Sequence, residues 1–152
     1  MKTPTSSASA SGSSLGLLFR QVRDAMWARM ADELALAGHD LSFSQYITLK
    51  KLAVGTSSAS ELARAAELNP GAMTRLIDKL IDRGLVERHA DPADRRAVRI
   101  QLSPQGLAIW HDIDQCGNRV RERAMAGMSE AERDQLICLL RQVCDNLSFS
   151  GH

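Results

Sequence analysis

Residues 84–104 restrict the possible folds of this chain more than any other segment. Two short alternating runs, 85–89 and 98–102, flank a connection that reads Asp91-Pro92-Ala93-Asp94-Arg95-Arg96. A connection rich in Pro and Asp between alternating runs is typical of a β-hairpin. Arginine side chains at a hairpin tip bury no apolar surface, so we expect an anionic partner such as the DNA minor groove, which attracts inserted arginine when it is narrow. The alternative is a solvated, charged loop.

Two helices joined by a tight turn are predicted just before this hairpin. Ser58-Ala-Ser-Glu61 has the spacing of a capping box, which predicts a helix that starts there and reaches residue 66. Asn69-Pro70 supplies an N-cap and a proline at N1 for a second helix over 70–83. Helix, turn, helix and two-stranded wing follow one another within about fifty residues, which is the order of a winged helix-turn-helix.

Three sequence motifs occur in order along this region. They read Met73-Thr-Arg-Leu-Ile-Asp-Lys-Leu80 with Gly84-Leu-Val86, then Asp91-Pro-x-Asp94-Arg95-Arg96, then Leu102-Ser103-Pro-x-Gly106. With these motifs, residues 15–147 resemble the MarR family of bacterial winged-helix transcription regulators. Ser103 stands where the family usually has Thr. The resemblance implies a mainly α fold with a small β-hairpin, in which a winged helix-turn-helix DNA-binding lobe at 42–103 joins dimerisation helices at 15–38 and 104–147.

The rest of the chain is predicted to be helical, apart from its start. Apolar residues recur at helical spacing from Leu15 to Leu34, and Ser42 and Ser129 each begin a further capping box. Residues 1–14 are rich in Ser, Ala and Thr and are predicted to form a disordered tail. Residues 15–152 are then expected to form a single domain.

The terminal helices are not needed for a winged helix to fold. Their apolar stripes either pack on their own domain or pair with a second copy of the chain. Two-fold dimers are the commonest oligomers, and a dimer places two recognition helices about one DNA turn (~34–36 Å) apart, as a palindromic site requires. The resemblance implies this homodimer, with the terminal helices interlocked between subunits.

The exposed face of the helix over 70–83 is expected to enter the major groove. Arg75 is predicted to bind guanine O6 and N7, a contact worth ~1–3 kcal/mol of base discrimination. The alternative is a surface ion pair of Arg75 with Asp78 or Asp82. Thr74 and Ala72 are expected at base edges, whereas Lys79, Pro70 and Gly71 are expected at phosphates together with Ser57, Ser58 and Ser60.

At the wing tip, Arg96 is predicted to insert into the minor groove. Arg95 is expected to pair with Asp94 or Asp91 and so to hold the shape of the wing, although the two arginines are interchangeable in this interpretation. The predicted DNA-binding set is Ser58, Ser60, Pro70, Gly71, Ala72, Thr74, Arg75, Lys79, Asp94, Arg95 and Arg96.

Regulators of this family generally respond to small aromatic compounds or to oxidants, so the resemblance implies an effector pocket between the terminal helices and the DNA-binding lobe. Its candidate wall is Phe19, Trp27, Met30, His39, Phe43, Tyr46 and Trp110, although each aromatic residue is alternatively plain core. His39 follows Gly38 in a turn, where a solvated cap is the alternative.

A redox-sensing regulator is a second interpretation of the chain. The redox-sensing members carry a cysteine in the first helix, and Cys116, Cys138 and Cys144 lie elsewhere. The four histidines show no ligand spacing with each other or with these cysteines, so no metal and no cofactor is expected. An odd number of unpaired cysteines indicates reduced thiols in the cytoplasm.

Composition narrows the function further. The net charge is +1, and residues 69–99 hold seven Lys or Arg against five Asp or Glu, so the case for DNA rests on where the arginines lie. No run of 18 apolar residues suggests a membrane span, and no nucleophile, phosphate-loop or metalloprotease motif suggests an enzyme. The prediction is therefore a dimeric, ligand-responsive repressor of a palindromic operator; repression is expected from the family alone. A winged-helix module that binds proteins instead of DNA is the alternative from another class.

Overall fold

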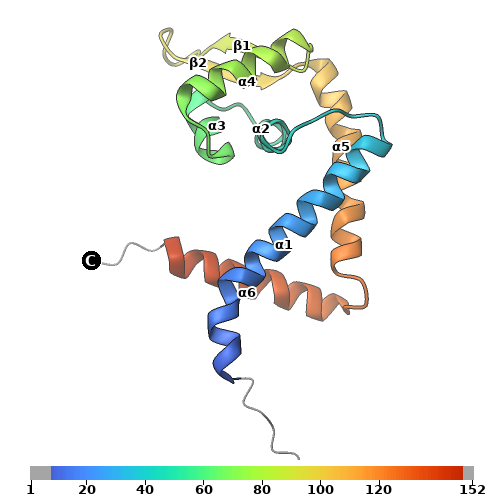
Figure 1. Ribbon diagram of the computed structural model, residues 1–152. Coiled ribbons are helices and arrows are strands. Elements are labelled where there is room, and N and C mark those ends of the chain that lie inside the picture. The colour runs from blue at the N-terminus through green and yellow to red at the C-terminus, as the bar shows by residue number, and fades with distance from the viewer. Residues whose placement is uncertain (1–7, 149–152) are drawn as a thin grey trace, which may run out of the picture.

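The computed structural model describes the backbone of residues 8–148 and the side chains of residues 14–148. Within that range, the chain forms helices and one antiparallel hairpin, which lies at the edge of the molecule (Figure 1). The elements in chain order are α1 (Ala8–Leu36), α2 (Phe43–Ala53), α3 (Ala59–Ala66), α4 (Pro70–Asp82), β1 (Val86–Ala90), β2 (Val98–Leu102), α5 (Pro104–Ala124) and α6 (Glu130–Ser148). We call α2 to β2 the winged lobe and α1, α5 and α6 the frame.

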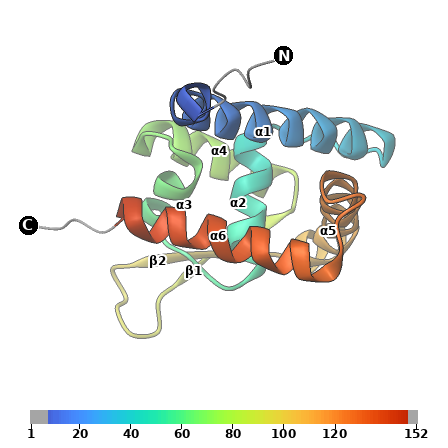
Figure 2. The same ribbon diagram turned by 90° about the horizontal axis from the view of Figure 1, so that it is seen from below.

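The prediction of a mainly α fold with one small hairpin is confirmed. Figure 1 places the winged lobe at the top, with α4 beside the hairpin, while the frame helices extend below it. Figure 2, seen from below, separates α1 and α6, which cross only in the projection of Figure 1. None of the helices among the described residues is long and apolar enough to cross a membrane.

The start of α1 differs from the sequence-based prediction. The helix begins at Ala8, so residues 8–14 are helical where a disordered tail was predicted; residues 1–7 lie outside the described residues. Alanine is the strongest helix former and serine does not prevent a helix from continuing, so this segment extends the amphipathic helix that follows it.

The predicted capping residues do begin their helices. Ser42, Ser58 and Ser129 each accept a hydrogen bond from the backbone N–H three residues on, at 3.2 Å in all three cases, and the Gln or Glu at that position returns the bond. Asn69 caps α4 as predicted, and Ser103 caps α5; both helices have proline at N1. These local bonds satisfy N–H groups that otherwise have no partner in the helix.

The core of the winged lobe forms where α3, α4 and the hairpin meet. Its largest fully buried side chains include Leu62, Met73, Ile77, Leu80 and Ile100. The apolar stripe predicted for the helix over 70–83 is the buried face of α4. In the hairpin, Val86 lies opposite Leu102 and Ala90 lies opposite Val98.

Two backbone features connect the winged lobe to its surroundings. Ser57 exchanges both backbone hydrogen bonds with Ile100, at 3.0 and 2.8 Å, so the segment before α3 lines the second edge of β2. Gly106, near the start of α5, lies so close to Leu85 that a Cβ there would sit 1.9 Å from the Leu85 carbonyl oxygen. Only glycine permits this close approach, which fixes where the frame leaves the hairpin.

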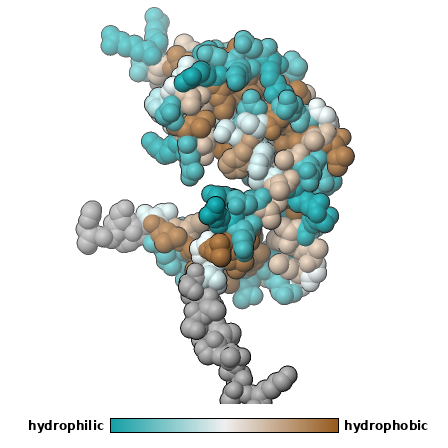
Figure 3. Space-filling view, in the orientation of Figure 1, coloured by the Kyte–Doolittle hydropathy of each residue, from teal (hydrophilic) through white to brown (hydrophobic). Residues whose placement is uncertain are grey.

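The frame leaves more of its apolar side chains exposed than the winged lobe does. Helix α1 packs along α5 and buries Met30 and Leu34. Across the described span 130–148 of α6, no residue is buried. Figure 3 shows apolar side chains at the surface in the lower part of the molecule, where α1 and α6 lie. Their exposed large apolar residues are Leu15, Leu17, Leu18, Phe19, Val22, Met26 and Leu36 on α1, and Ile137, Leu139, Leu140 and Leu147 on α6.

Candidate nucleic-acid interface

The turn between α3 and α4 sets the direction of the exposed helix. Glu67 ends α3 in the left-handed region, with φ of 55°, and is the only non-glycine residue with positive φ in the described part of the chain. Leu68 then donates its backbone N–H to the Ala63 carbonyl at 2.9 Å, and Asn69 caps α4. The sequence predicts a three-residue turn here, but no glycine signals its left-handed residue.

Helix α4 presents a polar face opposite its buried stripe. Thr74, Arg75 and Lys79 are exposed, and Ala72 is half-buried. The Arg75 Nε donates to the Gly71 carbonyl at 3.4 Å, and within residues 14–148 its guanidinium forms no ion pair. The alternative pairing of Arg75 with an aspartate of α4 is therefore absent from this part of the chain.

The first turn of α4 combines exposure with the positive end of the helix dipole. Pro70 and Gly71 are exposed there, whereas the N–H of Ala72 already donates to the Asn69 side chain at 2.8 Å. An exposed helix N-terminus attracts anions such as phosphate. These positions suit the phosphate contacts predicted for them.

The two aspartates of the wing tip accept hydrogen bonds from backbone N–H groups of the tip itself. Asp91 Oδ1 accepts from the Ala93 N–H at 2.9 Å, and Asp94 Oδ1 accepts from the Arg96 N–H at 3.0 Å. The predicted ion pair between Arg95 and one of these carboxylates is not formed; each carboxylate accepts a backbone N–H group of the turn. Asp94 therefore shapes the tip, and the side chains of Arg95 and Arg96 are exposed and without an ion pair among residues 14–148.

The serines before α3 differ from one another. Ser57 is 2% exposed and forms part of the sheet edge, so its hydroxyl does not face a phosphate as predicted. Ser58 is half-buried, and its hydroxyl accepts the capping bond from the Glu61 N–H. Ser60 is exposed on the first turn of α3. Among the three, Ser60 is the residue best placed to reach a phosphate.

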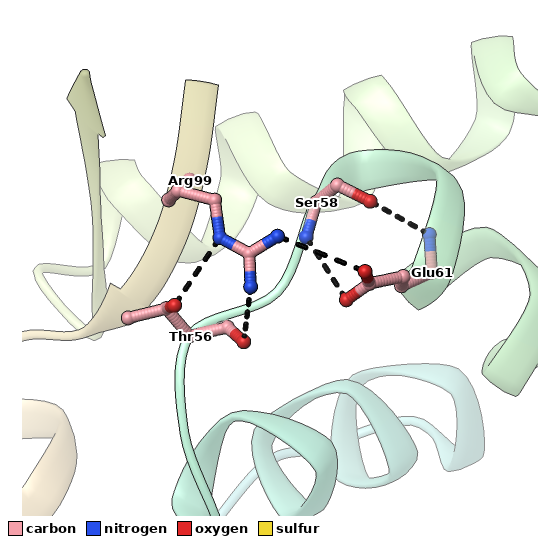
Figure 4. A network of polar contacts seen from close by, with 4 residues as sticks. All are labelled: Thr56, Ser58, Glu61 and Arg99. Carbon is pink, nitrogen blue, oxygen red and sulfur yellow. Dashed lines mark hydrogen bonds and ion pairs between the residues drawn. The ribbon is translucent and has the colours of Figure 1, made fainter. Parts of the chain in front are cut away.

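Sequence reasoning missed two arginines on the strands of the wing. Arg88 on β1 forms an ion pair with Asp78 on α4, at 2.6 Å from Nη2 to Oδ1. Arg99 on β2 binds Thr56 and Glu61 at the junction of α2 and α3 (Figure 4). The signal for Arg88 was the tight turn at Gly84, which brings β1 back along α4; no local signal connects Arg99 to Thr56.

Four of the candidate effector residues lie close together where α1, α2 and α5 meet. Trp27 contacts Phe43 edge-on at 4.9 Å between ring centroids and Tyr46 at 5.9 Å, and Tyr46 stacks with Trp110 at 6.1 Å. The Lys50 ammonium lies 5.8 Å from the Tyr46 ring centroid. Burial, aided by Asp114, raises the pKa of Tyr46, so its phenol stays protonated.

The other three candidates are in different situations. Met30 is buried in the core, and Phe19 lies on the exposed face of α1, outside the aromatic cluster. His39 is not a solvated cap: its Nε2 lies 2.5 Å from Asp112 Oδ2, and this bond ties the turn after α1 to α5.

The cysteines show no arrangement typical of a redox switch. Cys116 is fully buried, and burial raises the pKa of its thiol despite the nearby Arg119 guanidinium, so the reactive thiolate is disfavoured. Cys138 and Cys144 are exposed on α6 and unbridged. No group of His, Cys, Asp and Glu able to hold a metal ion occurs among the described residues.

Comparisons with known proteins agree with this geometry. The sequence model of the MarR family matches residues 42–98. The HTH-type transcriptional repressor NicR of Pseudomonas putida is 31% identical over 112 residues, which cover 73% of this chain and 71% of NicR.

Solved structures extend the match beyond the winged lobe. A mutant MarR from E. coli complexed with operator DNA superposes with a TM-score of 0.70 at 27% identity, covering 85% of this chain and 92% of that one. BpsR of Bordetella bronchiseptica, described for the regulation of its DNA binding by 6-hydroxynicotinic acid, gives a TM-score of 0.71 at 26% identity, covering 86% and 93%. The chain therefore belongs to the MarR family: it is a DNA-binding winged helix-turn-helix transcription regulator and not an enzyme.

Proposed function

We propose that this chain is a homodimeric repressor that binds a palindromic operator and is released from it by a small aromatic effector. The observation that carries the proposal is that one lobe presents two cationic elements, the exposed face of α4 and the wing tip. Arg75 projects from the exposed face of α4, and Arg95 and Arg96 extend from the wing tip, all without an ion pair among residues 14–148. Unpaired guanidinium groups on both elements favour a polyanionic partner over a neutral protein surface.

The two elements divide the recognition of DNA between them. Helix α4 enters the major groove, where Arg75 reads guanine and Thr74 contacts a base edge. Lys79, Pro70, Gly71 and Ser60 contact phosphates and set the register, which carries no sequence information itself. Arg96 or Arg95 inserts into the adjacent minor groove, and Asp94 keeps the tip in shape for it.

The frame helices form the dimer, which brings a second winged lobe to the second half-site of the operator. The winged lobe at 42–103 lies in the chain between helices that dimerise, at 15–38 and 104–147. Support comes from the exposed apolar residues of α1 and α6, which a second copy of the chain would cover. Such a dimer acts in the cytoplasm, where a bacterial operator lies.

The effector site lies at the aromatic cluster of Trp27, Phe43, Tyr46 and Trp110. Rings from α1, α2 and α5 meet there, and the Lys50 ammonium supplies a positive charge beside Tyr46. An aromatic acid suits this chemistry, and BpsR, which is regulated by 6-hydroxynicotinic acid, makes that compound the first probe. An effector releases the operator only if it binds the DNA-free shape of the dimer more tightly than the DNA-bound shape.

Fluorescence anisotropy tests the DNA-binding part of the proposal. The wild-type protein, Arg75→Ala and Arg96→Ala are titrated against duplex DNA from upstream of the chain's own gene, across a salt series. We expect tight binding that falls steeply with salt, weaker binding by both variants, and loss of sequence preference in Arg75→Ala alone. Selection from random DNA covers the case in which the operator lies elsewhere. If that selection yields no preferred duplex, the proposed recognition of a palindromic operator fails.

A further inference from the structure

The wing is a short element that depends on anchors at its base. Its strands have five residues each, and the last cross-strand pair is Ala90 with Val98, so the tip arginines lie beyond the paired region. A two-stranded ribbon of this length is marginally stable alone. Contacts between the strands and the rest of the lobe therefore decide where Arg95 and Arg96 point.

Arg99 on β2 forms the most extensive of these contacts (Figure 4). Its Nε donates to Thr56 Oγ1 at 3.2 Å, and its Nη2 donates to the Thr56 carbonyl at 2.9 Å. Its Nη1 lies 3.7 Å from Glu61 Oε1. All three guanidinium nitrogens are thus engaged by the segment that connects α2 to α3.

Glu61 serves two elements at once. Its Oε2 accepts from the Ser58 N–H at 3.3 Å, which closes the capping box of α3, while its Oε1 faces Arg99. The carboxylate that begins α3 therefore also holds β2. A single exposed ion pair contributes little, but the planar fork of arginine bound to both oxygens of Thr56 adds a directional constraint that a lysine does not provide.

The two strands of the wing are held by different partners. Arg88 ties β1 to α4 through Asp78, and Arg99 ties β2 to the segment before α3. Together the two arginines fix both sides of the ribbon relative to the recognition helix. Arg99 has all of its nitrogens occupied within the protein, unlike the arginines at the tip.

We propose that Arg99 is a positioning residue for DNA reading: through Thr56 and Glu61 it holds the wing at the angle that lets the tip arginines reach the minor groove while α4 occupies the major groove. Arg99 itself does not contact DNA. The inference rests on the DNA contacts proposed above for α4 and the wing.

A double-mutant cycle on operator affinity tests this role. Because Arg99 acts through the tip, Arg99→Met weakens binding roughly tenfold in the wild-type protein and has little further effect in a protein that carries both Arg95→Ala and Arg96→Ala. Arg99→Lys is as weak as Arg99→Met, since the ammonium lacks the fork. Additive effects of Arg99→Met and the double tip substitution would overturn the proposal, since they indicate a direct phosphate contact or a general loss of folded protein. Full rescue by Arg99→Lys would also overturn it, since an ammonium that restores binding indicates a direct phosphate contact.

Hydroxyl-radical footprinting of the same complexes gives a readout that stability alone does not change. At matched concentrations of folded protein, Arg99→Met loses protection at the minor groove and retains it at the major groove. Glu61→Gln, which keeps an acceptor for the capping box, shows the same loss to a smaller degree. Arg133→Met is the matched control, because it removes another arginine–glutamate pair, with Glu122, at the corner of α5 and α6 away from the wing; its footprint should match the wild type.

The wild-type footprint separates two kinds of failure. If wild-type protein gives no minor-groove protection, the proposed wing contact is wrong and the role of Arg99 fails with it. If that protection is present and Arg99→Met retains it, only the role of Arg99 is wrong.

Discussion

Helices α4 and α6 both carry apolar residues at helical spacing, but they differ in what covers those residues. The stripe of α4, including Met73 and Ile77, is buried against α3 and the hairpin. On α6, Leu140 is 37% exposed and Leu147 is 82% exposed, and no residue within its described span is buried. The same periodic pattern therefore completes a core in one region and leaves a face open in the other.

This difference separates two kinds of apolar stripe that look alike in a sequence. The apolar faces of the winged lobe pack against one another within about sixty residues of chain, which is the size of a small autonomous fold. Within the described residues of one chain, no element of the frame buries the apolar residues of α6. If the proposed homodimer is correct, the frame is the half of the molecule whose stability depends on a second copy.

The largest effect should come from a charge placed on the open face of α6. Leu140→Asp should convert the dimer to a monomer and weaken operator binding at least a hundredfold, since a single half-site then loses the contribution of the other. Sedimentation velocity and operator titration measure both changes. Gln142→Asp, on the same helix but outside the apolar stripe, is the matched control. A dimer that persists in Leu140→Asp would contradict the role given to α6.

Truncation in the winged lobe should destabilise the fold without changing its assembly. Ile77 is 1% exposed, so Ile77→Ala should lower the free energy of unfolding by about 2–5 kcal/mol through lost burial and a cavity. Urea unfolding followed by circular dichroism measures the loss, and sedimentation at low temperature should still show the wild-type oligomer. A monomeric but fully stable Ile77→Ala protein would contradict the comparison, because it would show that the winged lobe governs assembly and not stability.

The turn between α3 and α4 should be improved by a single substitution. Glu67 adopts φ of 55°, which is unfavourable for a residue with a Cβ. Glu67→Gly should raise the free energy of unfolding by roughly 0.5–1 kcal/mol, because the relief of strain exceeds the entropy that glycine adds to the unfolded chain. Glu67→Ala keeps the Cβ and should not stabilise the protein. Equal stabilisation by both variants would indicate that the glutamate charge, and not φ, is responsible.

The smallest effect should appear at the start of α6 as the pH falls. Hydrogen bonding with Ser129 lowers the pKa of Glu132. Because the folded pKa is below the unfolded one, the contribution is present above the unfolded pKa and is lost as the pH drops through the folded pKa. Glu132→Gln keeps the acceptor without titrating and should flatten the acid limb of the thermal stability profile, at pH values below the ordinary pKa of glutamate. Glu130→Gln, which removes a neighbouring carboxylate, should leave that limb near the wild-type profile.

Much of the fold could be predicted from sequence because its signals are local. The capping boxes at Ser42 and Ser58, the Asn69-Pro70 start of α4 and the alternating strands of the wing each depend on residues three or four apart, or on one short turn. Bonds at that range form wherever the helix or hairpin forms. The prediction for the tail was wrong at residues 8–14, because a composition rich in Ser and Ala does not exclude a helix and the helix that follows extends into this segment.

The candidate interface divides in the same way. The exposed arginines at positions 75, 95 and 96 were predicted from motif and spacing, whereas the anchors that position them join residues far apart in the chain. Arg99 lies 43 residues from Thr56, and His39 lies 73 residues from Asp112. The sequence by itself determined which helices begin where, which face of α4 is apolar and that two arginines stand at the wing tip. Only the tertiary structure decided how the wing is anchored, because such contacts form only after packing has brought distant segments together.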